Sequence, residues 1–217
     1  MQNINYHEWK RREQYEFFVG MDCPYFSLTT DLDITKTRAY MKENQIPSYL
    51  GMIYIVSRAL NLVEEFRVRL NLHCDPPEVL LYDIVHPSYA VLIKNSDKLN
   101  FCRGIFDPDS MEFLTTNKAL MKKAETETNL ELDPNRDDLI YISCLPWIHF
   151  KSISHPINYN PADFFPRITW GRFVEQGSKV IMALNVNVHH GLIDGLHVSH
   201  FIDNLIDLIK SPENVFS

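Results

Sequence analysis

The sequence predicts an α/β or α+β fold, a two-layer sandwich in which helices pack on a mixed β-sheet. Short runs of β-branched and aromatic residues recur along the chain, as β-strands do. Longer runs with apolar residues at helical spacing separate them. No repeat, low-complexity run or Gly/Ser linker interrupts the 217 residues. We therefore expect one domain over residues 1–217.

The first part of the chain predicts three helices and a strand. Residues 8–18 are rich in helix formers, and residues 26–34 alternate between apolar and polar side chains. Asp33-Ile-Thr35 predicts the cap of a helix that runs through Asn44, and Pro47 ends it. Ser48 then opens a long apolar helix that reaches Glu65.

The rest of the chain predicts the sheet and two further helices. Turn residues such as Asp-Pro-Pro and His-Pro separate the β-branched segments. Gln176-Gly177-Ser178 predicts a hairpin turn. Val198, Phe201 and Leu205 share one face of the last helix. The predicted strands cover residues 67–72, 79–85, 89–94, 99–105, 139–144, 167–175 and 179–188, and the helices cover 107–125 and 196–209.

Composition excludes several classes of protein. The 28 acidic and 21 basic residues give a net charge of -7, which argues against general nucleic-acid binding. No stretch approaches the roughly 20 apolar residues of a membrane span, and the N-terminus has no apolar signal core. We therefore expect a cytoplasmic protein that neither contacts a membrane nor binds nucleic acid. The irregular spacing of the cysteines predicts free thiols and no zinc site; they are Cys23, Cys74, Cys102 and Cys144.

The most informative segment lies where the last predicted strand meets the last helix. It covers residues 186–197 and reads Val-Asn-Val-His-His-Gly-Leu-Ile-Asp-Gly-Leu-His. Histidine is the usual general base near neutral pH, and rigid elements hold such side chains well. Alternation along a strand puts His189 and His190 on opposite faces, so one of them could be a core residue. Asp194-Gly195 could be only a turn with a helix cap. A metal site with His197 is disfavoured, because adjacent strand histidines do not easily reach one ion.

The order of residues in His189-His-Gly-Leu-Ile-Asp194 resembles the HHxxxDG signature of the CoA-dependent acyltransferases. That superfamily includes the chloramphenicol acetyltransferases, which are associated with antibiotic resistance, the dihydrolipoyl acyltransferases and the peptide-synthetase condensation domains. Residues 189–198 are similar to the chloramphenicol acetyltransferase version, HHAVCDGFHV, at all but four positions. Further similar segments cover nearly the whole chain: Trp9 to Glu13, Phe26-Ser-Leu-Thr, Asp33-Ile-Thr, Ile142 to Trp147 and Ile168-Thr169.

The resemblance implies a role for each matching residue. His190 would be the general base that takes a proton from an acceptor hydroxyl as it attacks acetyl-CoA, with no metal involved. Ser143 would donate a hydrogen bond to the oxyanion, and Thr169 would support the intermediate through a water. Asp194 would pair with Arg11 and hold the shape of the site. The implied contacts to acceptor or CoA are Phe17, Phe18, Leu92, Trp147 and Arg172.

The resemblance also implies a homotrimer with its active sites at subunit interfaces, and it leaves the acceptor open. Leu92 and Cys144 stand where the family has an aromatic residue and alanine, which puts chloramphenicol itself in doubt. A related acyltransferase with another alcohol or a thiol as acceptor is one alternative. The other alternative is a catalytically inactive homologue that binds a small molecule in the same pocket. The sequence alone also allows a purely structural role, as ordinary strand, core or surface residues, for Ser143, Thr169, Trp147 and Arg11.

Overall fold

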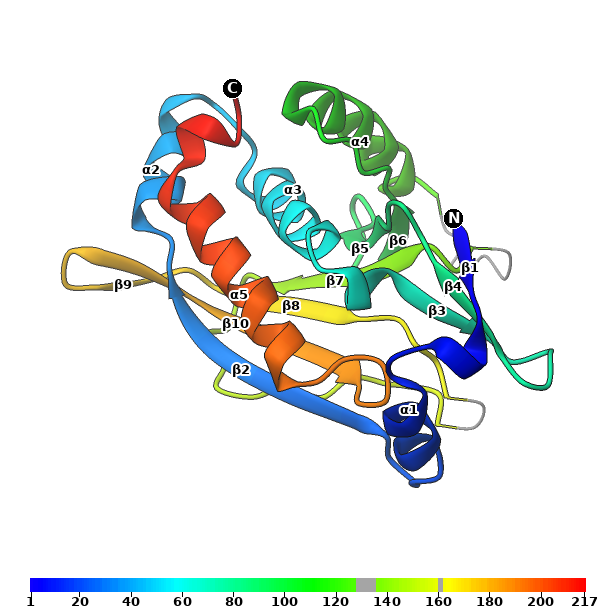
Figure 1. Cartoon of the computed structure of the whole chain (residues 1–217). Coiled ribbons are helices and arrows are strands. Elements are labelled where there is room, and N and C mark those ends of the chain that lie inside the picture. Colours follow the sequence, from blue (N-terminus) through cyan, green and yellow to red (C-terminus); the bar gives the residue numbers. More distant parts are fainter. Residues whose placement is uncertain (128–135, 160–161) are drawn as a thin grey trace.

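The computed structural model describes residues 1–127, 136–159 and 162–217, and it confirms the predicted mixed sheet with helices packed on it (Figure 1). The prediction for residues 126–138 was a polar loop, most of which lies outside the described residues. Within the described residues, the helices are α1 (Arg12–Val19), α2 (Thr35–Glu43), α3 (Ser48–Asn61), α4 (Ser110–Ala124) and α5 (Gly195–Lys210), with 3-10 turns η1 (Tyr6–Glu8), η2 (Glu64–Arg67) and η3 (Pro212–Asn214). None of these helices is long and apolar enough to cross a membrane.

Two sheets are present in the described part of the chain. The small sheet has the order β1-β4-β3, and the large one has the order β2-β10-β8-β7-β5-β6, with β9 beside β10. β7 is parallel to both β5 and β8, and the other pairs are antiparallel. The strands are β1 (Gln2–Ile4), β2 (Tyr25–Asp33), β3 (Val68–Asn71), β4 (Glu78–Leu81), β5 (His86–Leu92), β6 (Leu99–Arg103), β7 (Leu139–Leu145), β8 (Arg167–Gly171), β9 (Val174–Gln176) and β10 (Lys179–His189).

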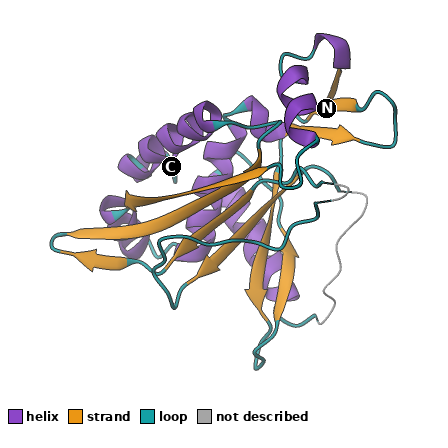
Figure 2. Cartoon of the chain, turned by 90° about the horizontal axis from the view of Figure 1, so that it is seen from below, coloured by secondary structure: helices purple, strands orange, loops and turns teal. Residues whose placement is uncertain are grey.

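The two faces of the large sheet differ. Helices α2, α3, α4 and α5 cover one face, here called the helix face, and alternate strand residues such as Ile142, Ile168 and Val186 pack into the core there. Figure 2 views the molecule from below, and on the side of the sheet away from these helices it shows a loop rather than helices crossing the strands. We call this side the open face. Thr169 and Asn185 alternate with core residues and therefore lie on the open face.

Several predicted boundaries were wrong. The helix expected over 8–18 begins only at Arg12, because Trp9 is extended and separates it from η1. The helix expected to reach Glu65 ends at Asn61, and η2 follows it. The strand expected over 167–175 breaks after Gly171, where the Arg172 N–H turns to the carbonyl of Ile148.

Candidate active site

A tight turn joins the end of β10 to the start of α5 and carries both histidines. Asp194 is the N-cap of α5, and its Oδ1 accepts a hydrogen bond from the Leu196 N–H at 3.0 Å. The Asp194 N–H in turn donates to Nδ1 of His197 at 3.1 Å. Nε2 of His197 lies 3.3 Å from Oε1 of Glu65. The turn is therefore fixed both by its own cap and by a contact to η2.

Arg11 holds this turn from the other side. Its guanidinium donates to Asp194 Oδ2 at 2.9 Å and to the carbonyls of His190 and Gly191, both at 3.3 Å. Burial alone would raise the pKa of Asp194, but the hydrogen bond from Arg11 and the neighbouring positive charges lower it. Asp194 is therefore ionised near neutral pH, and one arginine ties three points of the turn together. The pair that the sequence resemblance suggested is in contact.

We expect Asp194→Asn to lower both thermal stability and activity. Asparagine still caps α5, but Arg11 loses its ionised partner while only 13% of its side chain is exposed. Losing a charge-assisted hydrogen bond of this kind should cost about 1–2 kcal/mol of unfolding free energy. Differential scanning fluorimetry checks this against Asp203→Asn, the same change at an exposed position of α5. Equal melting temperatures for the two variants would contradict the role of the pair.

The His190 imidazole lies against two aromatic rings at this turn. Phe18 of α1 stacks on it with ring centroids 4.0 Å apart and an 11° angle, and Phe26 of β2 lies at 4.7 Å. The His190 backbone N–H donates to the Pro24 carbonyl at 2.7 Å. Among the described residues, no carboxylate lies within ion-pair distance of its ring. The ring is therefore oriented by packing and not by an acidic partner.

His189 has a different environment and is a core residue. It is 1% exposed and packs against the rings of Tyr15, Tyr25 and Phe164. Burial lowers its pKa to about 4, so the ring is neutral near pH 7. Its Nδ1 accepts a hydrogen bond from the Gly191 N–H. A Cβ at Gly191 would come within 3.0 Å of both His189 Cε1 and the Tyr15 backbone, which explains the glycine.

A second group of candidate residues forms a row across the open face. The strand register places Ser143 of β7 beside Thr169 of β8, and Thr169 beside Asn185 of β10. His155, from the loop that follows β7, reaches the same row with its Nε2 3.5 Å from Thr169 Oγ1. The Ser143 hydroxyl makes no hydrogen bond to a described residue. It is therefore free to donate to a bound molecule.

His190 and this row do not meet within one chain. Ser143 is two strands away from β10, and its register partner along the row, Asn185, precedes His190 by five residues. Strand geometry then separates Ser143 from His190 by roughly 19 Å between Cα atoms. The His190 ring also contacts Phe26, which the register puts beside Val188 on the helix face. The two groups therefore lie on different faces of the sheet.

The residues that the resemblance implied as contacts to the acceptor or to CoA are mostly at the surface. Trp147 and Phe17 are 60% and 66% exposed, and Leu92 is 44% exposed on the open-face side of β5. Arg172 is also exposed, whereas Phe18 touches His190. Cys144 points away from the row toward Tyr49 and Trp170, and burial raises the pKa of its thiol to about 12. Cys144 therefore remains a thiol at neutral pH.

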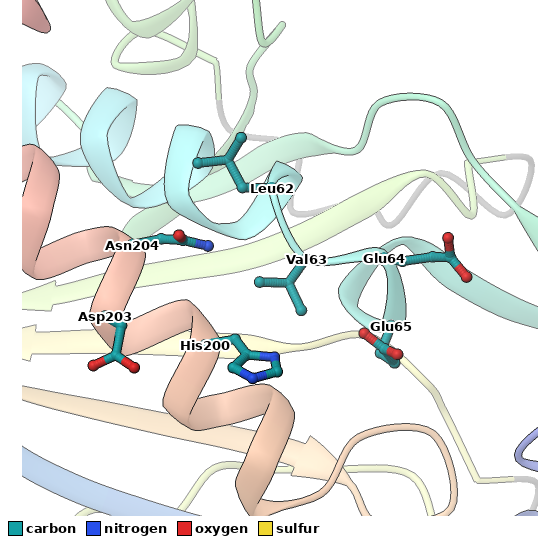
Figure 3. Close-up of a pocket in the computed structure, with 7 residues that line it drawn as sticks. All are labelled: Leu62, Val63, Glu64, Glu65, His200, Asp203 and Asn204. Carbon is teal, nitrogen blue, oxygen red and sulfur yellow. The ribbon is translucent and has the colours of Figure 1, made fainter.

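The pocket drawn in Figure 3 is lined neither by His190 nor by the row of Ser143, although Glu65, one of its lining residues, also contacts His197. It has a volume of about 330 Å³ and lies between the end of α3, η2 and the middle of α5. Carboxylates and one histidine line most of it, among them Glu64, Glu65, His200 and Asp203. In the described part of the chain, no three or more such side chains are grouped to hold a metal ion.

Sequence reasoning missed His155 and Asn185. A signal existed for Asn185, because β10 carries polar residues at every second position from Asn185 to His189 within an otherwise apolar strand. Nothing in the sequence marked His155, which lies in a loop without regular structure. Its place over the sheet depends on how the whole loop packs.

Comparison with known proteins defines the class of this chain. The family model for chloramphenicol acetyltransferase matches residues 1–206. Chloramphenicol acetyltransferase 2 of Escherichia coli is 32% identical over 203 residues, 93% of each chain. A solved chloramphenicol acetyltransferase superposes with a TM-score of 0.82 at 26% identity, covering 96% of this chain and 99% of that one. The cubic core of a pyruvate dehydrogenase multienzyme complex, at 15% identity and a TM-score of 0.68, shares the fold over 94% of this chain and 89% of its own.

The fold and these relatives define an acyltransferase. The chain belongs to the chloramphenicol acetyltransferase family.

Proposed function

We propose that this protein transfers the acetyl group of acetyl-CoA to a hydroxyl of chloramphenicol or a similar small molecule. The observation that carries the proposal is His190, a histidine clamped by Phe18 and by the Arg11–Asp194 turn in a chain of this family. The position of this side chain is fixed before any ligand binds, as a general base requires. Acetyl-CoA is the co-substrate, and the scheme needs no metal.

The chemistry follows from three side chains. The acceptor hydroxyl attacks the thioester carbonyl carbon while His190 takes the hydroxyl proton. The resulting tetrahedral oxyanion accepts a hydrogen bond from Ser143, and Thr169 supports it through a water. The intermediate then collapses, the carbon–sulfur bond breaks, and the imidazolium returns its proton to the leaving thiolate. The products are an acetyl ester and free CoA, and His190 is regenerated.

We further propose that the active form is a homotrimer of single 217-residue domains, working in the cytoplasm where acetyl-CoA is available. Support comes from the roughly 19 Å that separates Ser143 from His190 and from the different faces they occupy. In a ring of three subunits, each His190 faces the Ser143 and Thr169 of a neighbour, and each interface holds one site. The exposed Leu92 and Trp147 would be covered there, and the exposed Arg172 would remain available to the CoA phosphates.

Release of CoA tests the proposal. Purified protein is mixed with acetyl-CoA and chloramphenicol, free thiol is followed by absorbance, and mass spectrometry identifies the acetyl ester. We expect turnover that depends on both substrates, with a KM raised by the loss of an aromatic contact at Leu92, worth about 0.5–1.5 kcal/mol. Turnover of another alcohol but not of chloramphenicol would keep the reaction and change the acceptor. No turnover with any hydroxyl acceptor, or turnover with a thiol alone, would overturn the proposal.

A further inference from the structure

His155 is a polar side chain placed directly beside the proposed reacting centre. It comes from the loop after β7, is half-buried, and contacts Asn185 and Thr169 on the open face. Its Nε2 is 3.3 Å from Oδ1 of Asn185 and 3.5 Å from Oγ1 of Thr169. The proposed function puts Thr169 next to the tetrahedral intermediate. A group in contact with Thr169 is therefore within reach of the acceptor molecule.

Asn185 fixes which nitrogen of His155 carries the hydrogen. The Asn185 side chain is buried, and its Nδ2 donates to Ser27 Oγ at 2.8 Å, to the Leu28 carbonyl at 3.2 Å and to Thr29 Oγ1 at 3.0 Å. This orients the amide so that Oδ1, which only accepts hydrogen bonds, faces His155. The hydrogen of the imidazole is therefore on Nε2, and Nδ1 is left as an acceptor.

The ring is neutral, and its acceptor nitrogen is unused by the described residues. Burial lowers the pKa of His155, and the hydrogen bond to Asn185 only partly opposes this. Nδ1 makes no hydrogen bond to a residue in the described ranges. A buried asparagine with three donor contacts thus holds a half-buried histidine whose free acceptor suits a hydroxyl or amide N–H of a ligand.

We propose that His155, oriented by Asn185, is a specificity-determining residue that accepts a hydrogen bond from a second hydroxyl of the acceptor, beside the hydroxyl that is acetylated. This inference rests on the proposed function and narrows its substrate class to diols and related polyhydroxylated molecules. It accords with Leu92, which offers the acceptor no aromatic surface to stack on.

Matched acceptors test the inference. Chloramphenicol and its 1-deoxy analogue differ by one secondary hydroxyl, and wild type and His155→Leu are compared with both. Binding is measured by calorimetry and kcat/KM by CoA release. We expect wild type to prefer chloramphenicol and His155→Leu to lose about three- to tenfold of that preference, with kcat/KM for the deoxy analogue nearly unchanged. His155→Gln, which keeps an acceptor, should restore part of the preference. His149→Leu, the same change elsewhere in the loop, should not alter it.

The outcomes separate this inference from the proposed function. An unchanged preference in His155→Leu overturns the inference, as does an equal loss for both acceptors, which would mean that His155 only positions Thr169. Failure of wild type to bind either compound also overturns it. A binding preference that depends on His155, without any CoA release, would support the inference and overturn the proposed reaction. Melting temperatures check that each variant is folded.

Discussion

His190→Ala is expected to lower kcat for acetyl transfer by about 10²–10⁴-fold while the protein stays folded. The imidazole is the group positioned to take the hydroxyl proton, and no carboxylate among the described residues approaches its ring to replace it. Stacking on Phe18 would be lost, but the turn keeps its contacts to Arg11, because they use backbone carbonyls and Asp194. Steady-state CoA release, together with the melting temperature, measures both effects.

His189→Ala is the matched control, because it changes the neighbouring histidine. His189 is buried among Tyr15, Tyr25 and Phe164, so its removal leaves a cavity and should cost about 2–4 kcal/mol of unfolding free energy. Protein that remains folded should keep much of its kcat. If His189→Ala abolished turnover in folded protein while His190→Ala did not, the roles assigned to the two histidines would be reversed.

Ser143→Ala should lower kcat by about 10²–10³-fold with little change in KM. Its hydroxyl has no hydrogen-bond partner among the described residues, so the contact would form only with the developing oxyanion. A donor used only in the transition state affects kcat and not substrate binding. Ser88→Ala, a serine on the neighbouring strand β5, is the control and should leave kcat near the wild-type value. A Ser143→Ala variant with wild-type kcat would remove the oxyanion role.

Much of the fold could be predicted from the sequence, because hydrophobic periodicity is strong in the long elements. The apolar stripe of α5, the alternating apolar and polar residues of β2 and the hairpin at Gly177 are local patterns, and the structure confirms the helix, the strand and the hairpin that they predict. One strand of the small sheet, β1, was not predicted. It has only three residues, which are too few to show alternation. This strand becomes stable only by pairing with β4, a contact far away in the sequence.

The candidate site also has one part that could be predicted from the sequence and another part that could not. The turn from His189 to Asp194 is a continuous segment, so its residues could be found by spacing and by resemblance. The distance between His190 and Ser143 could not be predicted from the sequence, because it depends on the order of strands β10, β8 and β7 in the sheet. His155 is a still clearer case. Its contact with Thr169 arises from the path of an irregular loop that no periodic pattern describes.

Mixing two inactive variants tests most directly whether each active site is shared between subunits. His190→Ala and Ser143→Ala chains, carrying different tags, are co-expressed, and assemblies with both tags are purified. If each site takes His190 from one chain and Ser143 from its neighbour, every trimer that carries both tags has one intact site among its three, about a third of the sites. The account predicts that the mixture recovers about that share of wild-type kcat. Activity no higher than that of the two parent variants would place the site within one chain and contradict the account.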